Sequence, residues 1–536
     1  MTRLLFRGAR LIDGTGSPEQ SADVAVTDGT IAAVAAPGTL SPRSADHVVD
    51  SAGLVLAPGF IDAHSHADAV PFLDDVDVSK LSQGVTTEVT GNCGFSLAPC
   101  PPSHRDEIAG LCGRLFPDLA YDWSTVADLY GELARAGYPT NVVPLVGHHT
   151  LRTAVMGLED RHPAPRELDA TRAELRAALS AGACGLSSGL IYPPGMYADT
   201  DELVALLGVL SPAHVYATHT RGEGRSLIQS VDEAIEVAER AGVRLQMSHL
   251  KAAGRQAWGM IPAALERIDA AAGRGLTVHH DVYPYEANST LLASCLPPWF
   301  HAGSLQATMQ RLRDSDALAR AEADIGEADG GWENWVDGSG WANIMIASTA
   351  NHRFDGLMLT DIAQRRGTTA FQAMIDLLID NDLRVTMSVF AMSPADVREA
   401  LLHPRAVIGS DGLPPGPGGK PHPRLFGTFT RVLSQYVRAE QVLTLPEAIA
   451  KMTSLPARVF GLPDRGIVAP GAAADLVLLD PGAVSDRATY ADPTRLSAGI
   501  EMVLVNGVIS FTAGKSTGRR AGARLRSQKP MMNSHR

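Results

Sequence analysis

Apolar and polar residues alternate at both ends of the chain, in short runs separated by glycine-containing turns. The runs are residues 4–8, 23–29 and 31–34 near the start, and residues 466–471, 474–480 and 502–507 near the end. Alternation with a period of two is typical of strands that bury one face. We predict that residues 1–55 and 464–515 build one small β-sandwich domain from both ends of the chain.

The central part has a different pattern, in which short apolar runs alternate with longer stretches rich in Ala, Leu, Glu and Arg. The apolar runs that qualify as strands are 55–66, 86–91, 141–147, 183–189, 215–220, 244–249, 276–283 and 406–411. Intervening stretches such as 165–181, 226–241 and 262–272 have the composition of helices. Strands that alternate with helices predict an α/β fold with a parallel sheet, and eight of them predict a (β/α)8 TIM barrel over residues 56–463.

Two segments fall outside this repeat. Residues 286–404, between the seventh and eighth strand candidates, are too many for one crossover and are predicted to form an insertion. In a barrel it would lie over the C-terminal ends of the strands, where lids and substrate pockets form. Residues 516–536 hold six Arg or Lys residues and no apolar periodicity, which predicts a disordered basic tail.

Composition narrows the classes of partner. With 59 acidic and 46 basic residues and a net charge of −13, the chain offers no broad cationic surface for nucleic acid or an anionic membrane. Its apolar runs are too short for a membrane span and its N-terminus does not look like a secretory signal, so we expect a cytoplasmic protein. Five cysteines without a Cys-x-x-Cys pair indicate reduced thiols. A small-molecule substrate is therefore expected, whereas the oligomeric state stays open.

Histidines and one acid stand at the ends of predicted strands. His64 and His66 end the first strand, and their spacing puts both side chains on one face. His219, His249 and Asp411 end the fifth, sixth and eighth strands. Because the C-terminal ends of barrel strands meet at one mouth, these residues are predicted to converge there. Four imidazoles and a carboxylate suit a transition metal.

The same residues resemble the pattern of the amidohydrolase superfamily, with His-x-His on the first strand, His on the fifth and sixth, and Asp on the eighth. Within it, the chain is similar to the D-aminoacylases, also called N-acyl-D-amino-acid deacylases. The segments that carry the similarity are Thr-Gly-Asn-Cys-Gly-Phe-Ser at 90–96, Leu-Ser-Ser-Gly-Leu-Ile-Tyr-Pro-Pro-Gly at 186–195, His-Thr-Arg-Gly-Glu-Gly at 219–224, Ser-His-Leu-Lys at 248–251 and Asp-Val-Tyr-Pro-Tyr at 281–285. The resemblance spans about residues 1–515 and implies zinc-dependent hydrolysis of N-acyl-D-amino acids.

The resemblance also implies a set of metal ligands. Many relatives bridge two metals with a carboxylated lysine from the fourth strand, but residues 183–189 contain no lysine. In D-aminoacylases a cysteine of the second strand takes this role, and Cys93 occupies that motif position. A thiolate with two neutral imidazoles suits Zn²⁺. The expected tight zinc site consists of Cys93, His219 and His249. The expected site of a second, weaker ion consists of His64, His66 and Asp411.

Catalytic and substrate-binding candidates lie beside these ligands. Asp411 is the candidate proton shuttle between the attacking water and the leaving amine. Tyr192 is the candidate hydrogen-bond donor to the developing oxyanion, with an ordinary packed loop tyrosine as the alternative. The candidates for binding a substrate carboxylate, by position and by resemblance, are Lys251, Tyr283 and Arg424. For Lys251 and Arg424, the alternative is a solvated surface charge.

The segment after the seventh strand bears on side-chain preference. Residues 288–300 contain no arginine that could pair with a distal carboxylate of the substrate. We therefore predict a preference for neutral, mainly apolar D-residues such as D-Met, D-Leu or D-Phe.

Three other interpretations remain open. Gly185-Leu-Ser187-Ser-Gly189 matches the Gly-x-Ser-x-Gly pattern of serine hydrolases, although Pro193 and Pro194 disfavour the helix that this motif needs. A cyclic-amide hydrolase, similar to hydantoinase or dihydroorotase, would use the same metal chemistry, but the missing bridging lysine argues against it. A barrel can also persist as a non-catalytic metal-binding scaffold.

Overall fold

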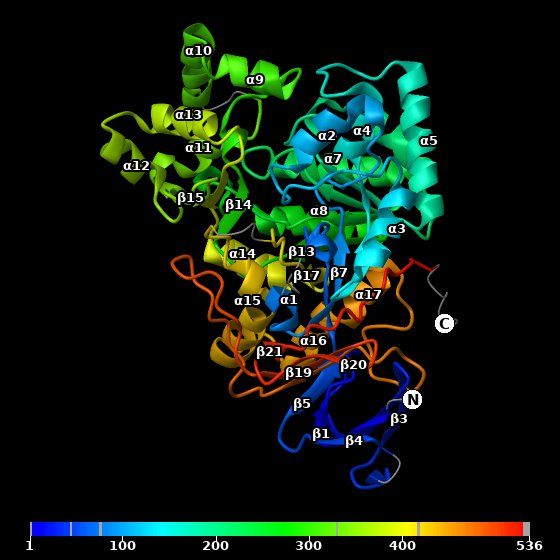
Figure 1. Cartoon of the computed structure of the whole chain (residues 1–536). Coiled ribbons are helices and arrows are strands. Elements are labelled where there is room, and N and C mark those ends of the chain that lie inside the picture. Colours follow the sequence, from blue (N-terminus) through cyan, green and yellow to red (C-terminus); the bar gives the residue numbers. More distant parts are fainter. Residues whose placement is uncertain (1–2, 43–44, 74–77, 328–330, 415–418, 529–536) are drawn as a thin grey trace.

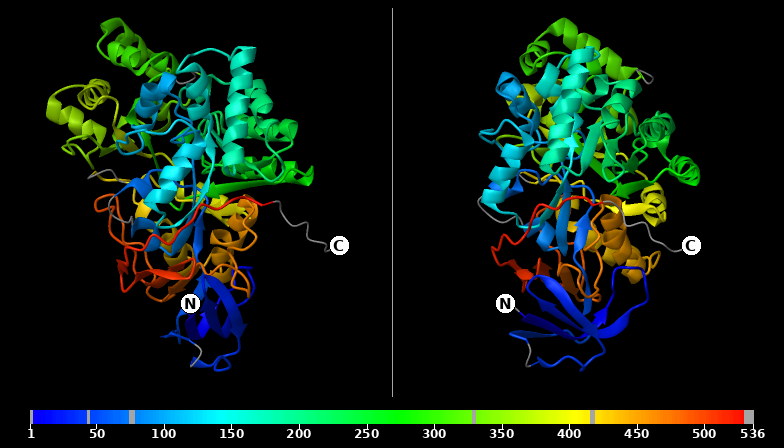
Figure 2. Two further views of the ribbon diagram at one scale, coloured as in Figure 1. Left: turned by 45° about the vertical axis from the view of Figure 1, so that its right-hand side comes forward. Right: turned by 90° about the vertical axis from the view of Figure 1, so that its right-hand side faces the viewer.

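The computed structural model describes residues 3–42, 45–73, 78–327, 331–414 and 419–528. Three parts are visible in Figure 1: a β-rich part at the bottom that holds the N-terminus, a central α/β part, and a mostly helical part at the upper left. The two further views in Figure 2 show the β-rich part at the end of the molecule opposite the helical part.

The central part is built from eight parallel strand positions. Their segments are β6 (Phe60–Asp62), β7 (Val85–Thr90), β8 (Asn141–Pro144) with β9 (Val146–Gly147), β10 (Gly185–Gly189), β11 (Val215–His219), β12 (Arg244–Met247), β13 (Val278–Val282) and β17 (Ala406–Ile408). They pair in the orders β6-β7-β8 and β9-β10-β11-β12-β13-β17, and Leu145 alone separates β8 from β9. A hydrogen bond from Ala63 N to Ile408 O joins the first strand to the last. This contact closes the ring expected of a (β/α)8 fold.

One predicted strand is divided between two parts of the fold. The apolar run 55–66 was expected to be the first barrel strand, but β5 (Val55–Pro58) pairs with β1 (Arg3–Leu11) and β18 (Leu476–Leu479) of the terminal sheet. Only β6, after Gly59, belongs to the barrel. A Cβ at Gly59 would lie 2.3 Å from the side chain of Thr86, so the close approach of β7 requires glycine at the point where the chain passes from one sheet to the other.

Helices cover the outside of the ring. They are α1 (Val78–Leu81), α2 (Arg105–Cys112), α3 (Val126–Ala136), α4 (His148–Met156), α5 (Pro165–Ala181), α6 (Thr200–Leu207), α7 (Leu227–Ala241), α8 (Ile261–Gly273), α14 (Pro394–Leu402), α15 (Arg424–Arg431), α16 (Leu445–Met452) and α17 (Ser454–Phe460). In α7 the residues Leu227, Val231 and Ala238 are buried at helical spacing, and the helix ends at Gly242 in the left-handed conformation. Such faces pack on the strands and form the main apolar core.

The two ends of the chain share one nine-stranded sheet. Its strands are β1 (Arg3–Leu11), β2 (Gln20–Thr27), β3 (Thr30–Ala35), β4 (His47–Asp50), β5, β18 (Leu476–Leu479), β19 (Ile500–Val505), β20 (Val508–Thr512) and β21 (Lys515–Ser516). The halves meet where β5 pairs antiparallel with β18. The sheet curls back on itself, so that the start of β3 meets the segment just before β18. Two hydrogen bonds join them, from Ile31 N to Ala472 O and from Ala474 N to Gly29 O. Apolar residues from both ends, Phe6 and Leu476 among them, form its core.

The segment between β13 and β17 contains a separate unit. Its elements are β14 (Ala287–Leu291), α9 (Leu305–Arg311), α10 (Ser315–Gly326), α11 (Trp335–Ser339), β15 (Ile344–Ser348), α12 (Leu359–Arg366), α13 (Ala370–Asp380) and β16 (Thr386–Phe390). The three strands form an antiparallel sheet in the order β14-β16-β15, and the unit has its own apolar core. Helix α14 lies inside the predicted range 286–404, but it packs on α8, β13 and β17 of the barrel. The insertion therefore ends before α14.

The basic tail differs from its prediction. Disorder was expected over 516–536, yet the part described, up to residue 528, is attached to the barrel. Hydrogen bonds join Gly522 N to Tyr138 O, Leu525 N to Val142 O, and Arg520 Nη2 to Leu73 O. Arginine side chains of the tail donate hydrogen bonds to backbone carbonyls. These bonds favour an ordered tail over one surrounded by solvent. Residues 529–536 lie outside the described residues. Across the described ranges, no helix combines the length and the apolar character needed to cross a bilayer.

Candidate metal centre and active site

The six predicted metal ligands meet at one mouth of the barrel. Each follows or ends a strand: His64 and His66 after β6, Cys93 after β7, His219 at the end of β11, His249 after β12, and Asp411 after β17. All six are buried. The convergence follows from the topology, because the C-terminal ends of parallel barrel strands face the same side.

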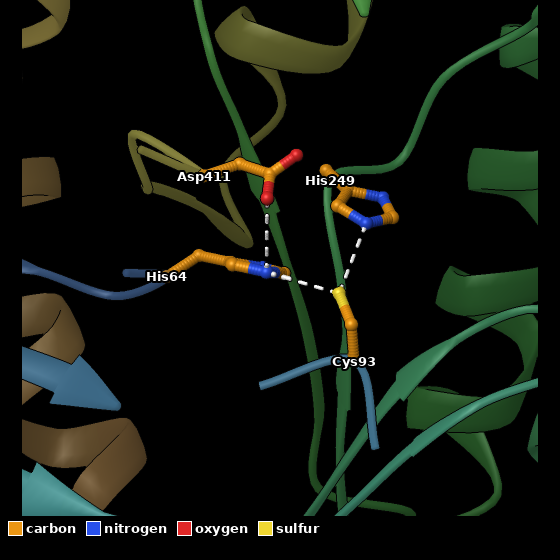
Figure 3. A group of neighbouring side chains, drawn as sticks. All are labelled: His64, Cys93, His249 and Asp411. Atoms are coloured by element: carbon orange, nitrogen blue, oxygen red, sulfur yellow. Dashed lines mark hydrogen bonds and ion pairs between the residues drawn. The ribbon is translucent and has the colours of Figure 1, made fainter. Parts of the chain in front are cut away.

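Four of these residues form the tightest group (Figure 3). Cys93 Sγ lies 3.3 Å from His64 Nε2 and 3.5 Å from His249 Nε2. His64 Nε2 lies 3.5 Å from Asp411 Oδ1. One ligand atom from each of the four residues lies within 4.8 Å of the others, which is close enough for contact with a shared ion.

The remaining two ligands flank this group. His66 Nε2 lies 3.2 Å from Asp411 Oδ1. His219 belongs to a second cluster with His249 and Glu223, in which His219 Nε2 is 3.6 Å from Glu223 Oε2. The expected separation into a Cys93–His219–His249 set and a His64–His66–Asp411 set is therefore not the grouping that the distances give. Cys93 lies between His64 and His249, at the centre of the cluster.

The donor set fits a cation. Among the described residues, the buried nitrogens His219 Nε2 and His66 Nδ1 have no hydrogen-bond partner. An unpaired buried polar atom costs free energy, and a central ion would supply a partner for His219 Nε2. Cys93, His249 and Asp411 also hold left-handed backbone conformations, with φ of 53°, 36° and 49°. Such conformations are rare outside glycine and gather at functional sites.

Electrostatics favour the ionised forms of the two anionic ligands. Burial opposes ionisation of the Cys93 thiol, but the charge of His64 and the neighbouring imidazoles of His219 and His249 lower its pKa well below the usual range. Burial also opposes ionisation of Asp411, yet Arg424 and His64 hold the pKa of that carboxyl well below its ordinary value. A thiolate and a carboxylate among imidazoles match the ligand preferences of Zn²⁺.

A second carboxylate orients the histidines. Asp281 Oδ1 lies 3.0 Å from His64 Nδ1 and accepts a hydrogen bond from the backbone N of His249 at 2.8 Å. Its other oxygen accepts from Gln246 Nε2 at 2.9 Å. With Nδ1 of His64 engaged in this way, Nε2 faces Cys93 and is free to act as a ligand.

The three predicted carboxylate binders lie together at the edge of the cluster. The Arg424 guanidinium is 4.7 Å above the Tyr283 ring, and Lys251 Nζ is 5.7 Å from the same ring centre. Arg424 Nη2 pairs with Asp411 Oδ2 at 2.9 Å, and Lys251 Nζ donates to Glu223 Oε1 at 2.5 Å. Both cations are buried, so the alternative of solvated surface charges does not hold.

Unused hydrogen-bond donors point to a ligand at this edge. Within the described ranges, Arg424 Nε, Arg424 Nη1 and the Tyr283 hydroxyl are buried without partners. Burial raises the pKa of Tyr283 well above its usual value, which keeps the hydroxyl protonated. Three unpaired donors, two of them on a cation, are complementary to the oxygens of a carboxylate.

A pocket of about 480 Å³, called the inner pocket here, opens over these groups. Besides the candidate ligands His66, Cys93, His219, His249 and Asp411, its lining consists of Phe95, Leu115, Tyr192, Glu223, Lys251, Tyr283, Asn288, Ser289, Thr290, Leu291, Trp335, Leu413 and Arg424. The Tyr192 ring packs edge-on against His219, and its hydroxyl lies 2.7 Å from Thr290 Oγ1. Burial raises the pKa of Tyr192 well above its usual value, so the hydroxyl stays a neutral donor.

The insertion supplies one wall of the inner pocket and is fastened to the barrel. Strand β14 contributes Asn288 to Leu291, and α11 contributes Trp335. Glu333 Oε2 accepts hydrogen bonds from the backbone N of Glu223 at 2.8 Å and of Gly224 at 3.1 Å. These bonds join the insertion to the loop that also carries Glu223 toward the metal cluster.

Known proteins share this arrangement over almost the whole chain. The amidohydrolase family model matches residues 361–511. An N-acyl-D-glutamate deacylase of Alcaligenes xylosoxydans xylosoxydans is 39% identical over 513 residues, covering 95% of this chain and 93% of that protein. The chain belongs to the D-aminoacylase family.

Solved structures of this family superpose on the chain. The N-acyl-D-glutamate deacylase of Bordetella bronchiseptica, in complex with zinc and a phosphonate inhibitor that mimics the tetrahedral intermediate, has a TM-score of 0.83 and 36% identity, and covers 98% of this chain and 99% of its own. A D-aminoacylase with a binuclear metal centre, described by one-metal activation and second-metal attenuation, has a TM-score of 0.80, 34% identity and the same coverage.

Sequence reasoning missed two residues of this D-aminoacylase site. Glu223 and Asp281 both lie in the segments that carried the resemblance, but neither received a role. Glu223 follows His219 by four residues and lies 3.0 Å from His249 Nδ1. Burial opposes its ionisation, but Lys251 and the histidines lower its pKa. Asp281 lies in strand β13, and a buried carboxylate in a strand was the signal that could have identified it.

The serine-hydrolase interpretation finds no support in the geometry. Ser187 is fully buried in β10. Its hydroxyl donates to the carbonyl of Gly91 and accepts a hydrogen bond from Gly94 N at 3.0 Å. Among the described residues, no histidine forms a hydrogen bond with it. Ser187 therefore holds the loop that carries Cys93.

Replacing Asp281 with asparagine is expected to weaken zinc binding about 10- to 100-fold, the usual effect of losing a partner that orients a histidine ligand. The Asp281 oxygens face three donors, which are His64 Nδ1, His249 N and Gln246 Nε2. The NH₂ group of an asparagine cannot accept a hydrogen bond from the donor that it would face. Zinc affinity measured by competition with a chelator checks this result. Asp23→Asn is the matched control, since that buried carboxylate binds the backbone N of Gly8 and Gly38 in the terminal sheet. Unchanged affinity in Asp281→Asn would remove this role.

Proposed function

We propose that this protein is a zinc-dependent deacylase that hydrolyses N-acyl-D-amino acids to a carboxylate and a free D-amino acid. The observation that carries the proposal is the position of unpaired donors on Arg424 and Tyr283 next to a cluster of zinc-type ligands. The donors on Arg424 and Tyr283 would bind the substrate carboxylate. A metal ion held by the ligand cluster would activate the amide bond. The geometry of the ligands does not determine the configuration of the substrate. Membership of the D-aminoacylase family supports the D configuration.

Zinc is supported by the donor set and by relatives that contain it. The ion would be held by Cys93 with His64, His249, His219, His66 and Asp411 as available ligands. Bound there, it would polarise the amide carbonyl and lower the pKa of a water molecule from about 15.7 toward 7. We propose one tight site that includes Cys93, and a second, weaker one. This proposal accords with the one-metal activation and second-metal attenuation described for a relative.

Residues of the chain perform the remaining tasks. Arg424, Tyr283 and Lys251 bind the α-carboxylate and orient the amide toward the cluster. Asp411 is ionised and can accept a proton from the attacking water, then return it to the leaving amine nitrogen. Tyr192 lines the inner pocket as a neutral donor and can stabilise negative charge on the carbonyl oxygen.

The lining supports a neutral, mainly apolar side chain on the D-residue. Within the inner pocket both cations other than the histidines already face carboxylates, Lys251 at Glu223 and Arg424 at Asp411. The remaining wall presents Leu115, Leu291 and neutral polar groups. We propose that the protein acts in the cytoplasm, which is supported by five buried cysteines that form no disulfide.

An activity screen with metal analysis tests the function. We expect N-acetyl-D-Met, D-Leu and D-Phe to be hydrolysed at least about 100-fold faster than their L-enantiomers, because inversion removes either the carboxylate or the side chain from its site. Chelation should abolish turnover and added zinc should restore it. Preference for L-substrates, or for hydantoins and dihydroorotate, would replace this function with another metallohydrolase activity. Activity that survives chelation would exclude the metal mechanism.

A further inference from the structure

A buried lysine links the first and last strands of the barrel. Lys80, on the short helix α1, is 2% exposed. Its Nζ donates to Asp62 Oδ2 at 2.5 Å and to Ser410 Oγ at 2.5 Å. Asp62 ends β6, and Ser410 follows β17 by two residues. Replacing a buried ion pair by apolar groups is often neutral or stabilising, so stability alone does not account for an ammonium at this position.

The two partners of Lys80 hold the backbone on both sides of Asp411. Asp62 Oδ1 accepts hydrogen bonds from Ser410 N at 2.8 Å and from His64 N at 3.2 Å. Ser410 Oγ donates to Asp62 Oδ2 at 2.6 Å and accepts from Gly412 N at 3.0 Å. The amides directly before and after Asp411 therefore end on groups that Lys80 binds. Asp411 itself has a φ of 49°, a conformation that persists only where its surroundings fix it.

A second carboxylate extends this network to the histidine ligands. Lys80 Nζ lies 3.7 Å from Glu88 Oε2, which accepts a hydrogen bond from Ser65 Oγ at 2.7 Å. Ser65 stands between His64 and His66 in the sequence. The buried ammonium is thus placed between the groups that hold the proposed proton shuttle and those that hold the His-x-His segment.

We propose that Lys80 is a positioning residue of the reaction, which fixes Asp411 and the segment that carries His64 and His66. The inference rests on the proposed deacylase function and adds a residue to it. Lys80 does not line the inner pocket, so it acts through its partners and not on the substrate. A proton shuttle must lie within hydrogen-bond reach of its proton, and a displacement of about 1 Å can cost on the order of a hundredfold in rate.

The test measures kcat and metal content of Lys80→Met on the zinc-loaded protein with N-acetyl-D-Met. Methionine is a flexible, apolar side chain that suits a buried site but donates no hydrogen bond. We expect kcat to fall about 10- to 100-fold. The tight zinc should remain, because Cys93, His219 and His249 follow or end other strands. Stability should fall as well, so the kinetics are measured well below the Tm of each variant.

Ser410→Ala tests the route by which Lys80 acts. It removes the hydroxyl shared by Lys80, Asp62 and Gly412, and should lower kcat about fivefold or more. If both residues act on Asp411 through one network, their effects are not additive. We therefore expect kcat of the double variant to lie within about twofold of Lys80→Met.

Lys451→Met is the matched control, because Lys451 is also a buried lysine, on α16, and its Nζ donates to His403 O at 2.5 Å before β17. It should lose stability but keep kcat within about twofold of wild type. Wild-type kcat in folded Lys80→Met, or fully additive effects in the double variant, would overturn the positioning role. If Lys80→Met does not fold, wild-type kcat in Ser410→Ala overturns it. No turnover of any N-acyl-D-amino acid by wild type would instead overturn the proposed function.

Discussion

Replacing Cys93 with alanine is expected to remove most bound zinc and to reduce kcat/KM by on the order of a thousandfold or more, since the thiolate lies at the centre of the proposed metal site and the proposed reaction needs the metal. Cys93 Sγ contacts both His64 Nε2 and His249 Nε2, so its loss opens the middle of the cluster. The alanine also leaves several imidazoles facing one another without the negative charge that offsets their repulsion. Metal content per protein and steady-state kinetics on N-acetyl-D-Met measure both effects.

Two further variants make this result specific. Cys184→Ala removes another buried cysteine, in the strand region of the barrel away from the ligands, and should keep its zinc and activity while losing about 1 kcal/mol of stability. Cys93→Asp restores a negative ligand and should recover part of the zinc. Full zinc occupancy in Cys93→Ala would show that another residue bridges the centre.

The second large effect is expected for Asp411→Asn, with kcat lowered by about 10²- to 10⁴-fold, the range for losing a general acid–base group. Asparagine keeps the size of the side chain but cannot accept and return a proton. The tight zinc should remain, because Cys93 and the imidazoles stay in place. KM should not rise, since Arg424 loses its internal partner and is freer to bind the substrate carboxylate.

The decisive readout is this combination of low kcat, retained zinc and unchanged or lower KM. Asp396→Asn is the control, because Asp396 is a buried carboxylate that accepts hydrogen bonds from Gly259 N outside the metal cluster. An Asp411→Asn enzyme with more than about one tenth of wild-type kcat would assign the proton transfer to another group.

Much of the site was predictable because it depends on where strands end. An apolar run followed by a histidine or an aspartate gives both a strand and the direction of its last side chain, and the topology of parallel strands brings those ends together. The histidines and Asp411 could therefore be predicted to converge without a structure, whereas Cys93 was named from the resemblance. Their grouping could not, since it depends on side-chain distances of a few ångströms between residues as far apart as His66 and Asp411.

Features that depend on partners distant in sequence were missed. Asp281 acts on His64, which lies 217 residues earlier, and no local pattern indicates such a pair. The order of the tail was missed for the same reason: its arginines and backbone find acceptors near residues 73 and 138–142, which the composition of 516–536 does not reveal. Helix α14 was placed in the insertion because its apolar face is the same whether it packs on the barrel or on another unit.

The origin of one pocket wall in a separately cored unit has an evolutionary consequence. Strand β14 and α11 bring Asn288 to Leu291 and Trp335 to the inner pocket, whereas the proposed metal ligands come from the barrel. Changes in the insertion can therefore alter which side chain or acyl group is accepted without disturbing the reaction centre. A new substrate selectivity can therefore evolve through substitutions in the insertion alone. Chimaeras that exchange the insertion between relatives would transfer substrate preference from one protein to another.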